Sequence, residues 1–574
     1  MKDSVLTDIG AKEPPQDWAS IDWQKVNKRV KNLRQRIYRA TQEGQWNKVR
    51  SLTKLMLRSY SNLLLSVRRV TQENQGKRTA GLDGQRALTP PERVVLVKEM
   101  QSYTLEHVKP AKRVYIPKAN STKQRPLGIP CLKDRIAQAV VKNALEPSWE
   151  ARFEANSYGF RPGRSCHDAI RQCHNRLQKG TDTWIFDADI RGAFDHISHE
   201  FILNRLGQTP GRELIKQWLK AGYVEAEMFH ETHSGTPQGG IISPLLANIA
   251  LDGLDELLAT FSKEKEYLYT HPDGRPKVCR KRRNRYGFIR YADDMLVTAE
   301  TKQDIEAIVP IIEAWLKQRG LELNQEKTKI TSAKDGINFL GFHIRQFKGR
   351  CYTFPQKEKV QSFLADIRAW LKANISAKPE AVIRKLNPLL RGWGNYYRHG
   401  ASKQTFNSID HQVWQALWQW ARKRHPHKGK CWIATKYFKP PHAKRWTLYT
   451  TIATRQGHKK IFTLFKLSDI PIERHTKVKG TASPDDPQLQ TYWTKRQTRY
   501  GKTYWVQNSK LRTVARNQDW RCPLCGEHLF NGEELHTHHQ VPIQEDGSDK
   551  VENLVHLHKV CHQHLHQMSM PLVL

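Results

Sequence analysis

The sequence predicts a multidomain α+β protein, and three observations lead to this prediction. The chain has 574 residues, which is more than a single hydrophobic core usually organises. Apolar residues recur with helical spacing near the N-terminus, mixed strand and helix patterns follow to about residue 350, and helical spacing then returns. Cysteines and histidines gather near the C-terminus, which predicts one more small module.

These patterns divide the chain into five segments. Residues 1–95 are predicted to be a basic helical extension, because apolar residues with helical spacing alternate there with many Arg and Lys. The other four are a mixed domain over 96–355, a helical module over 356–440, a basic region over 441–515 and a small domain over 516–574. The helical module is predicted from amphipathic stretches such as "SFLADIRAWLKANI" and "HQVWQALWQWARKR".

The charge of the chain points to a polyanionic partner. The chain has 95 Lys and Arg against 56 Asp and Glu, which gives a formal charge of +39. A charge this large attracts phosphates, so we expect nucleic acid as the partner. Residues 421–520 contain 23 Lys and Arg against 5 Asp and Glu, interleaved with aromatic residues that can stack on bases, although a basic linker is the alternative. No apolar run is long enough to span a membrane, and no membrane partner is expected.

Two predicted strands carry carboxylates in apolar surroundings. "WIFDADIRGAFDHIS" contains Asp187 and Asp189, and "FIRYADDMLV" presents Asp293 and Asp294 at the tight turn of a predicted hairpin. If the strands are neighbours, Asp189 lies beside Asp293, and such acids repel one another unless cations occupy the cluster. Two Mg²⁺ ions roughly 3.5 to 4 Å apart could activate a primer 3′-hydroxyl and stabilise a leaving pyrophosphate. The pattern therefore predicts the palm of a polymerase.

A second set of residues predicts a structural metal site. "CPLCG" supplies Cys522 and Cys525, and "HLHKVCH" supplies His558 and Cys561. Three thiols and one imidazole suit a closed tetrahedral Zn²⁺, which would stabilise a segment too small for a large core.

The chain resembles the group II intron-encoded proteins, which join a reverse transcriptase, a maturase and often a DNA endonuclease. The resemblance rests on motifs in family order: "VRRVTQENQGKRTAGLDG", "RVYIPKANSTKQRPLGIPCLKDRIAQ", "SYGFRPGRSCHDAI", the two acidic strands, "GTPQGGIISPLLANIALDGLD", "LNQEKTKI" and "INFLGFHI". It implies a right-hand polymerase with fingers, palm and helical thumb, followed by a basic DNA-binding region and a small zinc-stabilised ββα-metal HNH domain. It also implies that residues 1–95 bind RNA.

The resemblance also assigns roles to polymerase residues. Asp189, Asp293 and Asp294 would hold the two Mg²⁺ ions, and Phe194 would be the steric gate against a ribose 2′-hydroxyl, with core packing as its alternative. The remaining residues are substrate contacts: Arg113, Lys118 and Arg125 for the incoming triphosphate, Pro237, Gln238 and Gly239 for the substrate-positioning loop, and Lys327 for protonating the leaving pyrophosphate. Surface charge and a strand-connecting turn are the alternatives for these.

The stretch "LHTHHQVPIQEDGSDKVENLVHLH" resembles the HNH nuclease motif. By that resemblance His539 is the general base, and Asn553 orients it through backbone hydrogen bonds. His538, His562 and His566 would bind one divalent metal, expected to be Mg²⁺. Many relatives have an acidic residue where this chain has His536. A zinc ribbon that only binds DNA is the alternative.

The resemblance extends to the helical module, whose "RGWGNYYRHG" is similar to the family's domain X, which contacts intron RNA. Trp393, Tyr396, Tyr397 and Arg398 could bind RNA there, or pack in a core.

The predicted function is therefore a mobile group II intron protein: an RNA-directed DNA polymerase, a splicing maturase and an HNH endonuclease that nicks target DNA to prime reverse transcription. The expected partners are intron RNA in a ribonucleoprotein, target DNA and deoxynucleoside triphosphates, with a homodimer left open. We expect a bacterial-type cytoplasmic location, on the nucleoid when the protein binds DNA. The alternatives are a domesticated splicing maturase without polymerase activity and a reverse transcriptase with another task, such as phage defence.

Overall fold

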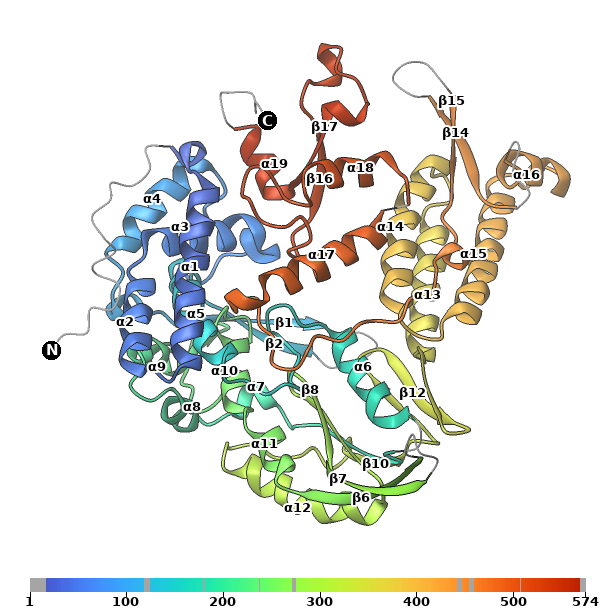
Figure 1. The fold of residues 1–574 in the computed structure, drawn as a ribbon. Helices are drawn as coiled ribbons and strands as arrows, with labels where there is room; N and C mark the ends of the chain where they lie inside the picture. Colours follow the sequence, from blue (N-terminus) through green and yellow to red (C-terminus); the bar gives the residue numbers. More distant parts are fainter. Residues whose placement is uncertain are drawn as a thin grey trace.

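The computed structural model describes residues 17–117, 124–178, 181–236, 238–270, 275–440, 446–453, 459–505 and 507–567. Lys118 and Pro237, two of the predicted substrate contacts, lie outside these residues. A helical block begins the chain, a mixed region follows, a helical bundle comes next, and the C-terminal segment returns to the N-terminal block (Figure 1).

The N-terminal block consists of four helices; the first three pack on a fifth, and the fourth packs on the third. They are α1 (Trp23–Gln42), α2 (Trp46–Leu57), α3 (Tyr60–Arg68) and α4 (Pro90–Gln101), and the fifth is α5 (Leu132–Glu150). Asp22 caps α1 by accepting a hydrogen bond from the Lys25 N–H, and Ser59 caps α3 in the same way. The predicted boundary at residue 95 falls inside α4, and the block shares its core with α5 rather than standing apart.

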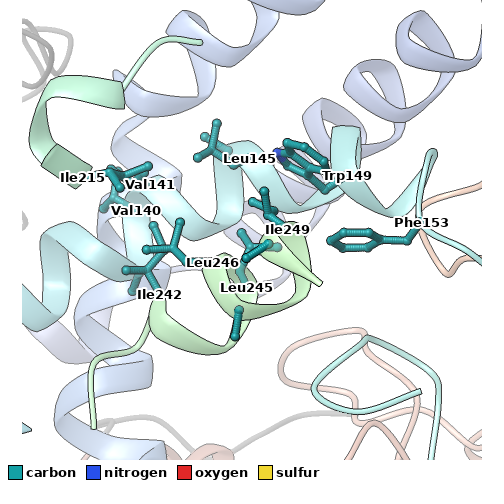
Figure 2. Close-up of a cluster of buried hydrophobic side chains, with 14 of the residues drawn as sticks. Val140, Val141, Leu145, Trp149, Phe153, Ile215, Ile242, Leu245, Leu246 and Ile249 are labelled. Carbon is teal, nitrogen blue, oxygen red and sulfur yellow. The ribbon is translucent and has the colours of Figure 1, made fainter. Parts of the chain in front are cut away.

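Helix α5 is buried around most of its circumference and lies at the centre of this core (Figure 2). Val141 of α5 lies beside Ile215 of α9 (Arg212–Lys220), and Leu246 and Ile249 of α10 (Ser243–Ala250) belong to the same buried cluster (Figure 2). The buried residues of α5 include polar side chains such as Asp134, Gln138 and Glu146. Its apolar residues share one core cluster with those of the N-terminal helices, α9 and α10, so α5 joins the N-terminal block to the mixed region.

The mixed region contains two four-stranded sheets. The first has the order β10-β3-β9-β8 and is antiparallel throughout: β3 (Trp184–Ala188), β8 (Gly287–Tyr291), β9 (Asp294–Ala299) and β10 (Lys329–Ser332). Alternate residues of this sheet face different cores, because Phe186 and Val297 join one cluster while Ile185 and Leu296 join the other. Both faces are therefore covered, one by α12 (Lys302–Lys317) and the other by α6 (Cys166–Leu177).

The second sheet has the order β2-β1-β4-β5, with β1 (Ala111–Pro117), β2 (Gln124–Ile129), β4 (Tyr223–Glu225) and β5 (Met228–His230). The other elements of the region are α7 (Ala193–His196), α8 (His199–Leu206), α11 (Leu254–Ala259), the hairpin β6 (Ser262–Thr270) and β7 (Pro276–Asn284), and the sheet β11 (Ile337–Phe339), β12 (Phe342–Phe347) and β13 (Arg350–Pro355).

The helical bundle consists of α13 (Lys357–Ala373), α14 (Pro379–Tyr397), α15 (Lys403–Arg424) and α16 (Lys430–Tyr437), followed by the hairpin β14 (Tyr449–Ala453) and β15 (Lys459–Thr463). The aromatics of "RGWGNYYRHG" serve packing here. Trp393 stacks on Phe363 with 5.1 Å between ring centroids, Tyr397 is buried, and the Tyr396 hydroxyl donates to the Leu340 carbonyl over 2.8 Å.

The C-terminal segment consists of α17 (Gln490–Tyr504), α18 (Lys510–Asn517), β16 (Leu535–His539), β17 (Leu554–His558) and α19 (Lys559–Leu565). Strands β16 and β17 pair antiparallel and α19 packs on both, in the predicted ββα order. Trp520 and Leu557 belong to the same core cluster as the N-terminal helices, and α19 lies beside that block (Figure 1). None of the described helices is long and apolar enough to cross a membrane.

Candidate active sites

The acidic strands meet at one end of the central sheet. Strand β3 pairs with β9 so that Asp187 lies opposite Leu296, and β8 pairs with β9 so that Tyr291 lies opposite Asp294. Ala292 and Asp293 therefore form a two-residue hairpin turn, with Ala292 at φ 59°. The sequence predicted this hairpin, and the structure brings its two acids close enough to Asp187 and Asp189 for their charges to interact.

The charges of the acids at this end of the sheet affect one another's pKa. Burial, followed by the charges of Asp293, Asp187 and Asp189, raises the pKa of Asp294 to about 7. Burial and the charge of Asp189 raise the pKa of Asp187 to about 6. Burial and Asp189 also raise the pKa of Asp293, although Arg125 and Arg290 oppose that rise. Oxygen ligands under mutual repulsion are what a hard divalent cation stabilises.

The acids are gathered less tightly than the other ligand clusters of the chain. Within the described residues, two groups bring three or more ligand atoms within 4.8 Å of one another, and both lie in the C-terminal segment.

The start of the motif "SYGFRPGRSCHDAI", to which the sequence analysis gave no role, supports the hairpin turn. The Tyr158 N–H donates to the Arg290 carbonyl and the Arg290 N–H donates to the Asn156 carbonyl, each over 2.9 Å. Gly159 lies so close that a Cβ there would be 2.2 Å from the Ala292 nitrogen. The buried Arg290 side chain donates to Asn248 Oδ1 over 3.0 Å and to the Ala292 carbonyl over 3.3 Å. The position of Asp293 therefore depends on this contact.

One predicted substrate contact, Lys327, lies beside the acids. Lys327 Nζ is 3.4 Å from Asp189 Oδ2, and the Asn324 N–H donates to the Asp189 carbonyl over 2.8 Å. Phe194 is half-buried in α7, with its ring centroid 6.3 Å from that of Phe160, whose ring is exposed. Phe194 also packs against the core, which is the alternative that the sequence left open for it.

The loop with Gln238 and Gly239 is attached to strand β2. The Gly128 N–H donates to the Gln238 carbonyl over 2.7 Å, and Gln238 Nε2 is 3.2 Å from both carboxylate oxygens of Asp195. Gly239 has φ 126°, and a Cβ there would be 2.6 Å from the Gly128 oxygen. A side chain would separate the loop from the strand, so glycine is required at this position.

The two described arginines of the predicted triphosphate site do not lie together. Strands β1 and β2 pair without interruption, with Arg113 opposite Gly128 and Arg125 opposite Ile116. Since residues three apart on a strand face opposite sides, the two side chains lie on opposite faces of this sheet. Arg113 stacks on the Tyr223 ring at 3.7 Å, whereas the positive charge of Arg125 lowers the pKa of Asp293.

The predicted zinc ligands converge as expected. The ligand atoms of Cys522, Cys525, His558 and Cys561 all lie within 4.8 Å of one another, and all four residues are buried. Cys525 Sγ is 3.3 Å from His558 Nδ1. Three sulfur atoms and one imidazole in a closed, buried cluster fit a structural metal with soft ligands. The sequence did not predict that α3 contributes Arg68, whose Nη2 donates to Cys561 Sγ over 3.1 Å.

A second cluster joins β16 to α19. His562 Nε2 lies 3.2 Å from His538 Nδ1 and 3.3 Å from His566 Nε2. Burial and the neighbouring histidines lower the pKa of His562 to about 4, so its imidazole is neutral near pH 7 and able to bind a metal. His536 has its ring centroid 5.2 Å from that of His562.

His539 and Asn553 flank the loop between the two strands. Asn553 Oδ1 accepts from the Val541 N–H over 2.7 Å, while its Nδ2 donates to the carbonyls of Val541 and Ser548. His539 Nε2 is 3.2 Å from Asp549 Oδ1, a partner that the sequence did not suggest. Lys510 contacts the same carboxylate. An imidazole oriented by a carboxylate can act as a general base.

Four family models match successive parts of the chain. They are described as "N-terminal domain of reverse transcriptase" over residues 18–100, "Reverse transcriptase (RNA-dependent DNA polymerase)" over 116–344, "Group II intron, maturase-specific domain" over 360–438 and "HNH endonuclease" over 522–568.

Relatives with similar sequences include two bacterial proteins. Protein YkfC of Escherichia coli is 35% identical over 349 residues, which cover 55% of this chain and 90% of that protein. The group II intron-encoded protein LtrA of Lactococcus lactis is 32% identical over 363 residues, which cover 50% of this chain and 60% of LtrA. A solved telomerase structure from Candida albicans overlaps 58% of this chain and 65% of its own at 12% identity, but a TM-score of 0.30 is too low to support an argument.

Proposed function

The chain belongs to the group II intron-encoded proteins, and from that premise we propose that one polypeptide performs RNA-directed DNA synthesis, supports splicing of intron RNA and nicks target DNA. The observation that carries the proposal is the acidic cluster of the central sheet. Asp189 lies beside Lys327, and Asp293 sits at a turn supported by Gly159. A domesticated maturase without polymerase activity would have no need of these intact acids, so it is not favoured.

Residues 96–355 would form the fingers and palm, and residues 356–440 would form the thumb, or domain X. The remaining segments would be an RNA-binding extension over 1–95, a DNA-binding region over 441–515 and the HNH nuclease over 516–574. The extensive packing of the N-terminal block on α5 supports a fixed position for that extension relative to the polymerase.

Asp189, Asp293 and Asp294 would hold two Mg²⁺ ions, which activate the primer 3′-hydroxyl and stabilise the charge on the transferred phosphoryl group. Arg125 would contact the incoming triphosphate. Its positive charge lowers the pKa of Asp293, so its side chain lies near the acids. Lys327 would donate a proton to the leaving pyrophosphate. Phe194, Gln238 and Gly239 would shape the nucleotide site, and Lys118 and Pro237 keep the roles that the family resemblance implies.

Arg113 fits the triphosphate role less well. Its guanidinium stacks on Tyr223, on the sheet face opposite that of Arg125. We propose that Arg113 supports β1 and β4 rather than gripping the nucleotide.

In the C-terminal segment, Cys522, Cys525, His558 and Cys561 would hold a structural Zn²⁺. His538, His562 and His566 would hold one divalent metal, which stabilises negative charge at a scissile phosphate. His539, oriented by Asp549, would take a proton from the attacking water, and Asn553 would keep the β16–β17 loop in place. The basic region would hold target DNA near both sites, and the nick would supply the primer for copying intron RNA.

The test separates the two activities on one substrate. The ribonucleoprotein assembled with intron RNA is given a duplex target and deoxynucleotides, and second-strand nicking and cDNA are measured for the parent and for His539→Ala. We expect His539→Ala to stop nicking but to extend a pre-nicked duplex at the parent's rate. Loss of both activities together would contradict the assignment of nicking to the C-terminal segment.

A further inference from the structure

A cavity of about 420 Å³ lies between the N-terminal block and α19. The N-terminal block contributes Lys77, Arg78 and Arg93 to its wall, and the C-terminal segment contributes Gln563, His566 and Gln567. Its described lining contains three basic residues and no carboxylate. The cavity therefore has an excess of positive charge that the wall itself does not neutralise.

The basic residues are held in place. Lys77 Nζ donates to the Gln72 carbonyl over 2.8 Å. Arg93 donates from Nε to Thr71 Oγ1 over 3.2 Å and from Nη2 to the Leu88 carbonyl over 2.6 Å, and it lies over the Trp18 ring at 5.9 Å. A guanidinium fixed in this way cannot turn outward to become hydrated.

Arg93 also has a donor without a partner. The residue is only 5% exposed, and its Nη1 has no hydrogen-bond partner among the described residues. A buried, charged donor without an acceptor costs free energy, and its positive charge adds to those of Lys77 and Arg78 at the cavity wall. The nearby carboxylate of Glu92 is already occupied, because it accepts from the N–H groups of Leu88 and Thr89.

The cavity adjoins the histidine cluster. His566, one of its wall residues, is also one of the three clustered histidines, and its Nε2 is 3.3 Å from that of His562. An anion in the cavity would therefore lie next to the place where the proposed nuclease binds the scissile phosphate.

We propose that this cavity binds a second phosphate of the target DNA backbone, next to the one that is cut. The proposal rests on the proposed nuclease function and adds a residue set to it: the N-terminal block, through Lys77, Arg78 and Arg93, completes the nuclease's DNA site. The exposed side chains of Arg78 and Gln563 leave the cavity open to a long polymer. Contacts to phosphates set the position of the duplex without reading its sequence.

The double variant Lys77→Gln, Arg78→Gln tests the cavity without removing the buried Arg93. Glutamine keeps a donor for the Gln72 carbonyl, so the fold should be retained. Arg86→Gln, Lys98→Gln is the matched control, because it removes the same two charges from exposed positions outside the cavity. We expect the cavity variant to bind duplex DNA about tenfold more weakly, with the slope of log affinity against log salt reduced by about 2.

A chemically neutralised phosphate identifies the contact directly. Duplexes that carry one methylphosphonate at successive positions near the nick are bound to the parent and to both variants, with fluorescence anisotropy as the measurement. We expect one position at which neutralisation weakens binding to the parent and to the control about tenfold, but weakens binding to the cavity variant no further. Inorganic phosphate should compete with duplex binding by the parent more strongly than by the cavity variant.

The outcomes separate this proposal from the one on which it rests. Equal methylphosphonate effects in the parent and the cavity variant at every position would overturn the proposed contact. The proposal would also be overturned if a neutralised phosphate weakened binding to the parent but not to the cavity variant in intron RNA and not in DNA. The cavity would then bind a phosphate of the RNA. If one methylphosphonate weakens duplex binding by the parent but not by the cavity variant, and the parent nicks no duplex, the phosphate site is supported and the nuclease function is rejected.

Discussion

Arg68 of the N-terminal block donates a hydrogen bond to Sγ of Cys561, over 3.1 Å, and so joins two parts of the chain that are 493 positions apart. The guanidinium lies over the Trp23 ring at 4.6 Å and is 3.2 Å from Glu73 Oε1. Asn27 adds a second link, since its Nδ2 donates to the Cys525 carbonyl over 3.2 Å. The metal cluster is therefore attached to the N-terminal block and does not belong to the C-terminal segment alone.

Replacing Arg68 should weaken metal binding. In Arg68→Gln a charge-assisted donor to a ligand sulfur is lost, and we expect metal affinity to fall by about 10- to 100-fold, as for other outer residues that orient ligands. Zinc release to a chromogenic chelator, followed over time, measures the effect. Arg58→Gln, at an exposed arginine of the same block, should release zinc like the parent. Equal release from all three proteins would show that Arg68 does not support the cluster.

Gly159→Ala should impair polymerisation while sparing the nuclease. The added methyl would be 2.2 Å from the Ala292 nitrogen, so the turn that carries Asp293 must move. A shift of about 1 Å at a catalytic group can cost about 100-fold in rate, and we expect cDNA synthesis to fall by that order. Gly392→Ala is the control, because a Cβ at Gly392 meets nothing within 4 Å. Parent-like cDNA synthesis by Gly159→Ala would mean that the turn does not need this contact.

The acid cluster should make Mg²⁺ binding depend on pH. The pKa of Asp294 is raised from 3.8 to about 7 and that of Asp187 from 3.8 to about 6. A carboxyl whose folded pKa is raised costs stability as the pH rises from its unfolded pKa through its folded pKa, and a cation bound to the ionised acids offsets that cost.

The rise in Tm on adding Mg²⁺ should therefore be small at about pH 6 and should grow up to about pH 8. Differential scanning calorimetry with and without Mg²⁺ measures this dependence. Asp294→Asn should flatten the profile, and a parent profile already flat over this range would contradict the prediction.

Asp549 should support His539 in the nuclease. Without the carboxylate 3.2 Å from Nε2, the imidazole of His539 loses its orienting partner. In Asp549→Asn we expect nicking to slow by about tenfold to a hundredfold. This is part of the rate enhancement of roughly 10²–10⁴-fold that a positioned general base supplies. Lys510→Gln removes the other partner of Asp549 and should have the smaller effect. If the nicking rate falls more in Lys510→Gln than in Asp549→Asn, the carboxylate does not act through His539.

Local patterns predicted the parts of the fold that depend on nearby residues. Alternating apolar residues on both sides of Asp293 specified the hairpin, and the motifs "CPLCG" and "HLHKVCH" specified all four ligands of the metal cluster. Strand faces were not predictable, because Arg113 and Arg125 are assigned to opposite sides by the register of β1 and β2. The contact between Arg68 and Cys561 depends on tertiary packing, of which local patterns carry no signal.

We propose that the acids of the central sheet carry out RNA-directed DNA synthesis. The proposal is tested most directly by incubating the purified protein with a primed RNA template, Mg²⁺ and deoxynucleotides and measuring cDNA, alongside the Asp293→Asn, Asp294→Asn double variant and His539→Ala. We expect cDNA from the parent and from His539→Ala, and none from the double variant. Equal cDNA from the double variant, or none from the folded parent even when it is bound to intron RNA, would contradict it.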